Sequence, residues 1–228
     1  MKSKFNKEKK LVICGTGETA ILAYEYFTKD SSYEVCAFAV NQKFKKSSSL
    51  LGLPIVEIEE IEQTYPVSEF SVFVAVSSGR LNRNRAELYN YVKSKNYEVA
   101  SYISSRAFVW DNVEIGENCL ILENNVLQPF TKIGHNVTMW SGNHIGHRSL
   151  IGDHVFISSH CVISGFCEIG KFSFLGVNST LADKIILQED NFISMGAVIS
   201  KNTEKNGLYR GNPAEKHNLG ARRFCKVR

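Results

Sequence analysis

The sequence has no long apolar run, no strong excess of one charge and only 4 proline residues. Because a membrane-spanning helix needs about 18 to 20 apolar residues in succession, none is predicted. The lysines at the amino terminus are followed by an apolar stretch too short for a signal peptide, so we expect a cytoplasmic protein. With 228 residues, 43% of them hydrophobic and 22% charged, the composition excludes fibrous and disordered classes.

The net charge of +4 is concentrated at the amino terminus, where the first ten residues hold five lysines and one glutamate. A nucleic-acid-binding protein would present a basic face, and the rest of the chain is balanced. Five basic residues near the end are interpreted as a solvated tail rather than a binding patch: Lys216, Arg222, Arg223, Lys226 and Arg228. We therefore expect neither nucleic acid nor a membrane as a partner.

Cysteine pairs of the C-x-x-C type are absent, which argues against a zinc or redox site. In a cytoplasmic protein the 6 cysteines are expected to stay reduced and to serve as small core residues. A zinc enzyme built on histidines would also need an H-x-x-x-x-H pair, and this spacing does not occur among the histidines from His135 to His160. No metal cofactor is predicted.

From Ile103 onward, every sixth residue is apolar without a gap as far as Ile199. Glycine follows the apolar residue at six places: Gly116, Gly134, Gly146, Gly152, Gly170 and Gly176. A period of six fits neither an α-helix nor a coiled coil, but it fits a solenoid with flat faces of one hexapeptide each. With three faces to a coil, residues 18 apart lie one above the other, and the series ends at Lys205, where residues 204–228 could fold over the end.

Residues 1–102 follow another pattern. Apolar runs predict buried strands at 11–14, 34–40 and 70–76, and helical patterns cover 20–28 and 82–95. Alternation of strand and helix predicts a small parallel sheet with helices packed on it. The two patterns define a Rossmann-like domain at 1–102 and a repeat domain with a carboxyl-terminal tail at 103–228.

A glycine-rich turn, Gly15-Thr16-Gly17, follows the first strand and opens the first helix. Backbone N–H groups in such a turn can hold a phosphate. Three interpretations stay open, namely a mononucleotide or nucleotide-sugar site, a structural turn, and a NAD site. The last is disfavoured because Asn41 stands where a dinucleotide fold has an acidic residue for the ribose.

Histidines gather in the repeat, and His147 is the strongest candidate for a functional one. In coils of 18 residues, His147 stacks on Gly165, which leaves open space over the ring and a bare backbone N–H beside it. A base next to such a donor could serve acyl transfer. The plainer interpretation of any single histidine here is a solvated side chain on the wall of the solenoid.

The segment Ser141–His154, together with Gly211–Ala214, resembles the left-handed β-helix acyltransferases. The whole chain, with its glycine-rich turn and the segment Gly52–Val56, is similar to the family of sialic acid O-acetyltransferases and bacillosamine N-acetyltransferases. This resemblance implies a small Rossmann-like parallel sheet followed by a left-handed parallel β-helix of hexapeptide repeats. It also implies a homotrimer, with acetyl-CoA in the groove between neighbouring β-helices and a sugar nucleotide on the N-terminal domain.

The family's general base corresponds to His147 and its oxyanion-binding N–H to Gly165. Two family features differ, because Arg148 replaces a glutamate that orients the base, and Phe156 replaces a second active-site histidine two residues beyond His154. Substrate binding is assigned to Gly15, Thr16 and Gly17 for the phosphates, to Asn41 for base or ribose, and to His154. A column that could carry the pantetheine arm comprises Ser159, Val177 and Met195, with room beside it at Gly176 and Gly196.

The hypothesis that follows is an acetyl-CoA-dependent N-acetyltransferase that acts on the amino group of a UDP- or dTDP-linked amino-deoxy sugar. Such a product would serve surface glycan synthesis, for example of lipopolysaccharide. Imidazole titrates near neutral pH and is suited to take the proton of the attacking amine. Two alternatives stay open, namely O-acetylation of sialic acid or a related sugar, and a non-catalytic β-helix scaffold.

Overall fold

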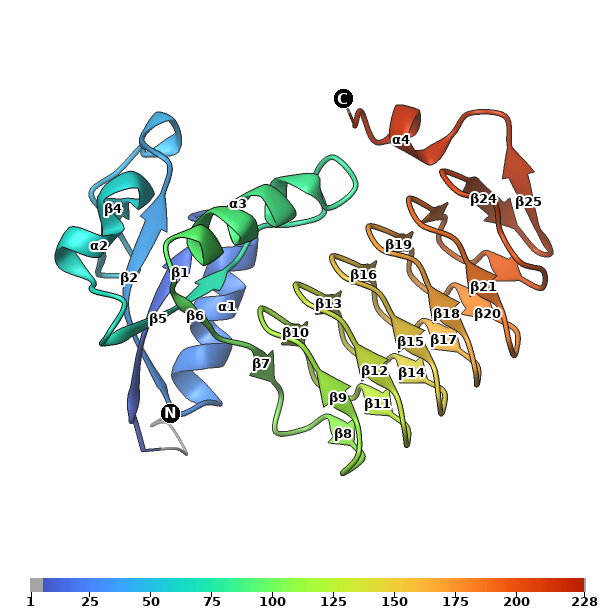
Figure 1. The fold of residues 1–228 in the computed structure, drawn as a ribbon, viewed down its shortest axis with the longest axis horizontal. Helices are drawn as coiled ribbons and strands as arrows, with labels where there is room; N and C mark the ends of the chain where they lie inside the picture. The colour runs from blue at the N-terminus through green and yellow to red at the C-terminus, as the bar shows by residue number, and fades with distance from the viewer. Residues whose placement is uncertain (1–5, 228) are drawn as a thin grey trace. The chain divides into compact units, whose positions relative to one another are not determined.

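The computed structural model describes residues 6–227, which form two compact units (Figure 1). The first unit comprises the described residues up to Ser77 together with Glu87–Tyr102. The second comprises Ser78–Ala86 and the chain from Ile103 onward. A short segment, residues 78–86, thus lies within the sequence-defined N-terminal domain but packs with the repeat domain.

A six-stranded sheet forms the first unit, in the order β3-β4-β2-β1-β5-β6. Its strands are β1 (Lys9–Cys14), β2 (Tyr33–Val40), β3 (Ser49–Leu50), β4 (Leu53–Glu57), β5 (Phe70–Val74) and β6 (Glu98–Val99). All neighbours pair in parallel except the short β3, which is antiparallel to β4. Its helices are α1 (Glu18–Lys29) and α2 (Ile61–Thr64), with 3₁₀ turns η1 (Gln42–Phe44) and η2 (Ile58–Glu60), and α3 (Arg83–Ser94) belongs to this unit from Glu87 onward.

Strand β1 is the centre of this sheet, and its residues from Leu11 to Cys14 are fully buried. A strand that is covered on both faces consists of consecutive apolar residues, and this is why the buried strand at 11–14 could be predicted from the sequence. The chain runs from β1 to one side through β2 and β4, and then to the other side through β5 and β6. The carboxyl ends of β1 and β5 therefore flank the point where the strand order reverses, which is the usual ligand position in such sheets.

The second unit is a left-handed parallel β-helix with three faces (Figure 1). The first face holds β7 (Tyr102–Ile103), β10 (Leu120–Ile121), β13 (Thr138–Met139), β16 (Phe156–Ile157), β19 (Phe174–Leu175) and β22 (Phe192–Ile193). The second face holds β8 (Phe108–Val109), β11 (Val126–Leu127), β14 (His144–Ile145), β17 (Val162–Ile163), β20 (Thr180–Leu181) and β23 (Val198–Ile199). The third face holds β9 (Glu114–Ile115), β12 (Lys132–Ile133), β15 (Leu150–Ile151), β18 (Glu168–Ile169) and β21 (Ile186–Leu187).

Each short strand pairs with the strand 18 residues further on, as the repeat predicted. Ile145, for example, pairs with Ile163, and Ile163 pairs with Leu181. The apolar series is the second residue of each strand and is buried from Ile121 to Ile199. Its first member, Ile103, is 39% exposed because it lies in the first coil. The core of this unit is thus one column of apolar side chains for each face.

The corners of the β-helix all use the left-handed backbone conformation. From Asn118 to Gly196, every sixth residue has a positive φ. Asparagine and glycine tolerate this conformation best, but Phe130, Arg148 and His154 also adopt it. We call the corner between the first and second faces the first corner, that between the second and third faces the second corner, and the remaining one the third corner.

The carboxyl-terminal tail closes the first face. Strand β24 (Leu208–Gly211) pairs in parallel with β22, and β25 (Ala214–His217) then pairs antiparallel with β24. Helix α4 (Ala221–Phe224) follows, and the ring of Phe224 lies edge-on to Phe192 at a centroid distance of 4.9 Å. Arg228, one of the predicted tail cations, lies outside the described residues.

Segment 78–86 is held against the third corner by a buried arginine. Arg85 is 2% exposed, and its guanidinium donates to the backbone carbonyls of Asn136, His154 and Val155 at 3.2 to 3.3 Å. It also donates to the side-chain oxygen of Asn136 at 3.1 Å. Burial lowers the pKa of Arg85 to about 9, which leaves a cation at neutral pH. The carbonyl dipoles therefore replace the water that this charge has lost.

The same segment contains a turn of left-handed backbone, with φ of 53°, 50° and 67° at Arg80, Leu81 and Asn82. This conformation costs roughly 1–2 kcal/mol for each residue other than glycine. The side chain of Asn82 donates to the carbonyls of Phe172 and Ser173 at 3.3 and 3.2 Å, and Leu81 is buried. These contacts with the β-helix hold the turn in place.

Candidate functional site

His147 lies at the second corner, two residues after the end of β14, and its ring covers Gly165 of the next coil. A Cβ placed on Gly165 would lie 2.7 Å from Cε1 of His147 and 3.1 and 3.2 Å from its two ring nitrogens. The ring of Phe166 meets the imidazole edge-on at 4.9 Å. The glycine thus leaves the space that the imidazole occupies, and the exposed ring can be reached from solvent.

The backbone N–H of Gly165, which the sequence suggested to be bare, donates to Oδ1 of Asp183 at 2.9 Å. Asp183 is the next member of the same column, 18 residues beyond Gly165, and it is exposed. Sequence analysis missed this residue, although counting one more coil from Gly165 finds it. Any ligand that uses this N–H must first displace the carboxylate.

Arg148 follows His147 in the sequence, but its side chain packs on an aromatic ring. Its guanidinium lies over the ring of Phe130, 4.4 Å from the centroid. The ring of His147 is instead positioned by packing, between the backbone of Gly165 and the edge of Phe166.

His154 is at the third corner, on a different edge of the β-helix from His147. Its ring stacks on Phe172, and its Nδ1 lies 2.9 Å from the side-chain nitrogen of Asn136. Burial lowers the pKa of His154 to about 4, which the Asp153 carboxylate opposes and Arg85 reinforces. At neutral pH it is therefore a neutral, packed side chain, and its contact with substrate stays a prediction.

Ser159, Val177 and Met195 form a column on the first corner, as 18-residue spacing requires. Met195 is 78% and Val177 42% exposed, so this column presents apolar surface to solvent. The predicted space at Gly196 exists, since a Cβ there would meet nothing within 4 Å. The predicted space at Gly176 does not, because a Cβ would lie 2.5 Å from the backbone nitrogen of Met195. That glycine serves the packing of the next coil.

In the first unit, Gly15-Thr16-Gly17 joins β1 to α1 at the carboxyl edge of the sheet. Gly15 has φ of 134°, and a Cβ there would lie 2.6 Å from the carbonyl oxygen of Ala75, so no other residue fits. Gly17 is the N-cap of α1, and a Cβ on it would meet nothing within 4 Å. Gly15 is thus required by the turn, whereas Gly17 leaves the amino end of a helix open to an anion.

Asn41, which directly follows β2, is paired with an acidic residue of the 3₁₀ turn η2. Its side-chain nitrogen donates to Oε1 of Glu59 at 3.1 Å, and the N–H of Gln42 donates to Oε2 at 3.2 Å. The carboxylate that is missing from the end of β2 in the sequence is therefore supplied by η2. Sequence analysis did not identify Glu59, because it belongs to a segment without a recognisable motif.

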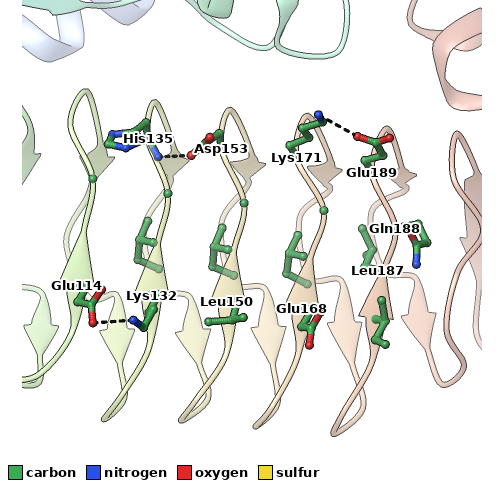
Figure 2. Close-up of a pocket in the computed structure, with 18 of the residues that line it drawn as sticks. Glu114, Lys132, His135, Leu150, Asp153, Glu168, Lys171, Leu187, Gln188 and Glu189 are labelled. Carbon is green, nitrogen blue, oxygen red and sulfur yellow. Dashed lines mark hydrogen bonds and ion pairs between the residues drawn. The ribbon is translucent and has the colours of Figure 1, made fainter.

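A shallow groove of about 790 Å³ runs along the third face (Figure 2). Its lining includes the column of Gly116, Gly134, Gly152 and Gly170, where a Cβ would clash with the next coil. Ion pairs line it, including Lys132 with Glu114 at 2.8 Å and Lys171 with Glu189 at 3.4 Å (Figure 2). No residue of the second corner lines the groove, so it is distinct from the surroundings of His147.

Within residues 6–227, no helix is long and apolar enough to cross a membrane. Among the same residues, no three side chains of histidine, cysteine, aspartate or glutamate are grouped as metal ligands. The six cysteines are free, and burial raises the pKa of the Cys14 thiol to about 12.

Comparison with known proteins supports the fold. Residues 112–147 match the family model described as bacterial transferase hexapeptide (six repeats). The chain is similar to the acetyltransferase domain of PglB from Neisseria gonorrhoeae, with a TM-score of 0.82 and 21% identity over 92% of this chain and 100% of that one. It is also similar to perosamine N-acetyltransferase from Caulobacter crescentus in complex with CoA and GDP-perosamine, with a TM-score of 0.82 and 19% identity over 92% and 97%. WeeI from Acinetobacter baumannii matches with a TM-score of 0.60 and 19% identity over 92% and 100%.

Proposed function

We propose that this protein is an acetyl-CoA-dependent N-acetyltransferase that acts on the amino group of a nucleotide-linked amino-deoxy sugar. The observation that carries the proposal is the position of His147, an accessible imidazole over the backbone of Gly165 on a β-helix corner. The similarity to a solved N-acetyltransferase whose complex holds CoA and GDP-perosamine supports the substrate class. The resemblance to sugar acetyltransferases in sequence points the same way.

The reaction removes two protons from the substrate ammonium, of which one leaves to solvent and one ends on the sulfur of CoA. An amine is mostly protonated near neutral pH, so it first loses one proton through His147 to solvent and becomes a nucleophile. His147, again neutral, takes the second proton as the nitrogen attacks the thioester carbonyl and the C–N bond forms. The tetrahedral intermediate then collapses, the C–S bond breaks, and the sulfur of CoA receives the proton from the imidazolium. No covalent intermediate with the protein is needed.

Gly165 is the proposed donor to the oxyanion of that intermediate. Removal of such a donor costs about 3–4 kcal/mol in other enzymes. In this structure the N–H is bonded to Asp183, so its use in catalysis requires the carboxylate to move. A carboxylate left beside the developing oxyanion would repel it.

The sugar nucleotide is assigned to the first unit. The helix amino terminus at Gly17, the turn at Gly15-Thr16 and the side chain of Asn41 would hold the phosphates and the ribose or base. The open space at Gly17 supports this assignment, as does the position of the turn at the reversal of strand order. UDP, dTDP and GDP sugars all fit the chemistry of a phosphate-binding turn.

A homotrimer is proposed because His147 and the apolar column of Val177 and Met195 lie on two different corners of one chain. These corners are the two edges of the second face. In an assembly of copies, the first corner of one chain can lie beside the second corner of the next, so that the pantetheine arm and the base belong to one groove. The exposure of Val177 and Met195 supports such a groove.

The proposal is tested by release of CoA thiol from acetyl-CoA with a panel of UDP-, dTDP- and GDP-linked amino sugars, alongside free sialic acid. Wild type is expected to turn over an amino-sugar nucleotide, and His147→Ala to lose this activity. His135→Ala is the matched control, because His135 is also an exposed corner histidine but lies on the third corner. Turnover of sialic acid alone would support the O-acetyltransferase, and an inactive wild type would support the scaffold.

A further inference from the structure

Two charged or polar side chains from different coils meet at Gly165. The imidazole of His147 covers its Cα side, and the carboxylate of Asp183 accepts its N–H at 2.9 Å. Both side chains are exposed. A substrate nitrogen bonded to His147 therefore arrives beside the one glycine that also anchors Asp183.

The bond from Asp183 has a structural counterpart elsewhere in the β-helix. At the third corner, Oδ1 of Asp153 accepts the N–H of His135 at 2.7 Å, across the same spacing of 18 residues. This pair shows that a corner aspartate can serve simply to satisfy a backbone donor. What distinguishes Asp183 is the imidazole over the glycine to which it is bonded.

We propose that Asp183 recognises the ammonium form of the substrate amine and leaves the Gly165 N–H in doing so, which frees this donor for the acyl oxygen. This inference rests on the proposed function and makes its site selective for amines over hydroxyls. A carboxylate forms a stronger hydrogen bond with an ammonium group than with a neutral backbone N–H, because both partners are then charged. The ammonium of the substrate can therefore draw the Asp183 carboxylate away from the Gly165 N–H. Arg148, the basic side chain next to His147, is stacked on Phe130.

This movement of Asp183 is needed because its carboxylate and the oxyanion of the intermediate would otherwise compete for the same Gly165 N–H. Before the amine binds, Asp183 occupies the donor and acetyl-CoA is not activated. When the ammonium binds, its excess proton passes through His147 to solvent, and the acyl oxygen takes the vacated N–H. The device would suppress attack of water on acetyl-CoA when no acceptor sugar is present.

The first test compares Asp183→Asn with Asp153→Asn. Each variant keeps a side-chain oxygen that can accept the corner N–H, so both should fold equally well, as checked by thermal unfolding. Asp183→Asn is expected to raise KM for the amino-sugar nucleotide about 10- to 100-fold, the usual worth of a hydrogen bond between charged groups. Asp153→Asn should keep the wild-type KM, and equal KM values in wild type and Asp183→Asn would overturn the inference while leaving the proposed function intact.

The second test needs no acceptor sugar and measures CoA release from acetyl-CoA in water. Asp183→Ala is expected to hydrolyse acetyl-CoA several-fold faster than wild type, because the Gly165 N–H is then free. Asp153→Ala should match wild type. An unchanged rate in Asp183→Ala would overturn the exchange. A wild type inactive on every amino-sugar nucleotide would instead overturn the proposed function together with the inference.

Discussion

The imidazole of His154 stacks on the phenyl ring of Phe172, with ring centres 4.7 Å apart and planes inclined at 28°. Burial in this stack lowers the pKa of His154 to about 4. Above pH 6.5 the ring is neutral in folded and unfolded chains alike. As the pH falls from about 6.5 towards 4, the unfolded chain takes up a proton that the folded chain does not, so the free energy of unfolding decreases.

We expect this group to remove about 2 kcal/mol of stability by pH 4, once screening by solvent is allowed for. His154→Asn should abolish this part of the pH dependence, because asparagine does not titrate and would extend the existing contact of Asn118 with Asn136. Urea unfolding at pH 7 and pH 5 measures the difference. An equal pH dependence in wild type and variant would contradict the shifted pKa.

Arg85 is expected to be a large contributor to the stability of the second unit. Arg85→Met removes the donors to three backbone carbonyls and leaves them buried, so we expect a loss of about 3–5 kcal/mol in the free energy of unfolding. Arg222→Met is the control, since Arg222 is exposed in the tail of the same unit. A loss below about 1 kcal/mol for Arg85→Met would show that segment 78–86 is not held by this side chain.

Gly165→Ala should separate activity from stability. The three atoms nearest to the new Cβ all belong to the ring of His147, a side chain that can swing away, so we expect the folding free energy to change by less than about 1 kcal/mol. The displaced base should lower kcat about 100-fold.

Gly170→Ala is the opposite case, because its Cβ would meet the backbone nitrogen of Glu189 at 2.3 Å. This variant should lose about 1–3 kcal/mol of stability but keep wild-type kcat per folded molecule. Normal kcat in Gly165→Ala would argue against His147 as the base.

Substitutions of Gly15 and Gly17, the two glycines of the turn between β1 and α1, should likewise separate stability from ligand binding. Gly17→Ala is expected to fold normally, because nothing lies within 4 Å of its Cβ, and to weaken binding of a nucleoside diphosphate. Gly15→Ala should destabilise the first unit, since its Cβ would meet the carbonyl of Ala75. Calorimetric titration with UDP, dTDP and GDP measures the first effect, and unchanged affinity in Gly17→Ala would contradict a phosphate site there.

The strand pairing of the β-helix could be predicted from the sequence because the spacing between paired strands is constant. Once the spacing of 18 is known, Ile145 must pair with Ile163, and the stacking of His147 on Gly165 follows without further information. The bond from Gly165 to Asp183 obeys the same rule. It was missed because a corner aspartate is read as a solvated residue unless one asks which donor it meets.

Segment 78–86 could not be predicted in this way. Arg85 belongs to a helical pattern rich in polar residues, and nothing near it in the sequence indicates burial. Its partners, such as the carbonyls of Asn136 and Val155, are 51 and 70 residues away. Gly176 and Gly196 differ in their place in the hexapeptide, since Gly176 directly follows the apolar residue and Gly196 is a left-handed corner residue. The sequence analysis predicted space at both, but the path of the next coil leaves none at Gly176.

The hairpin of β24 and β25 gives the solenoid a defined length. Parallel coils could in principle continue indefinitely, since each rung offers the next the same unpaired backbone groups. Strand β25 runs antiparallel to β24, so the outermost edge of the first face no longer has the direction that another coil requires. A copy of this chain that met this edge would find no strand of matching direction there, so the reversal of a single strand opposes continuation of the first face into an end-to-end fibre.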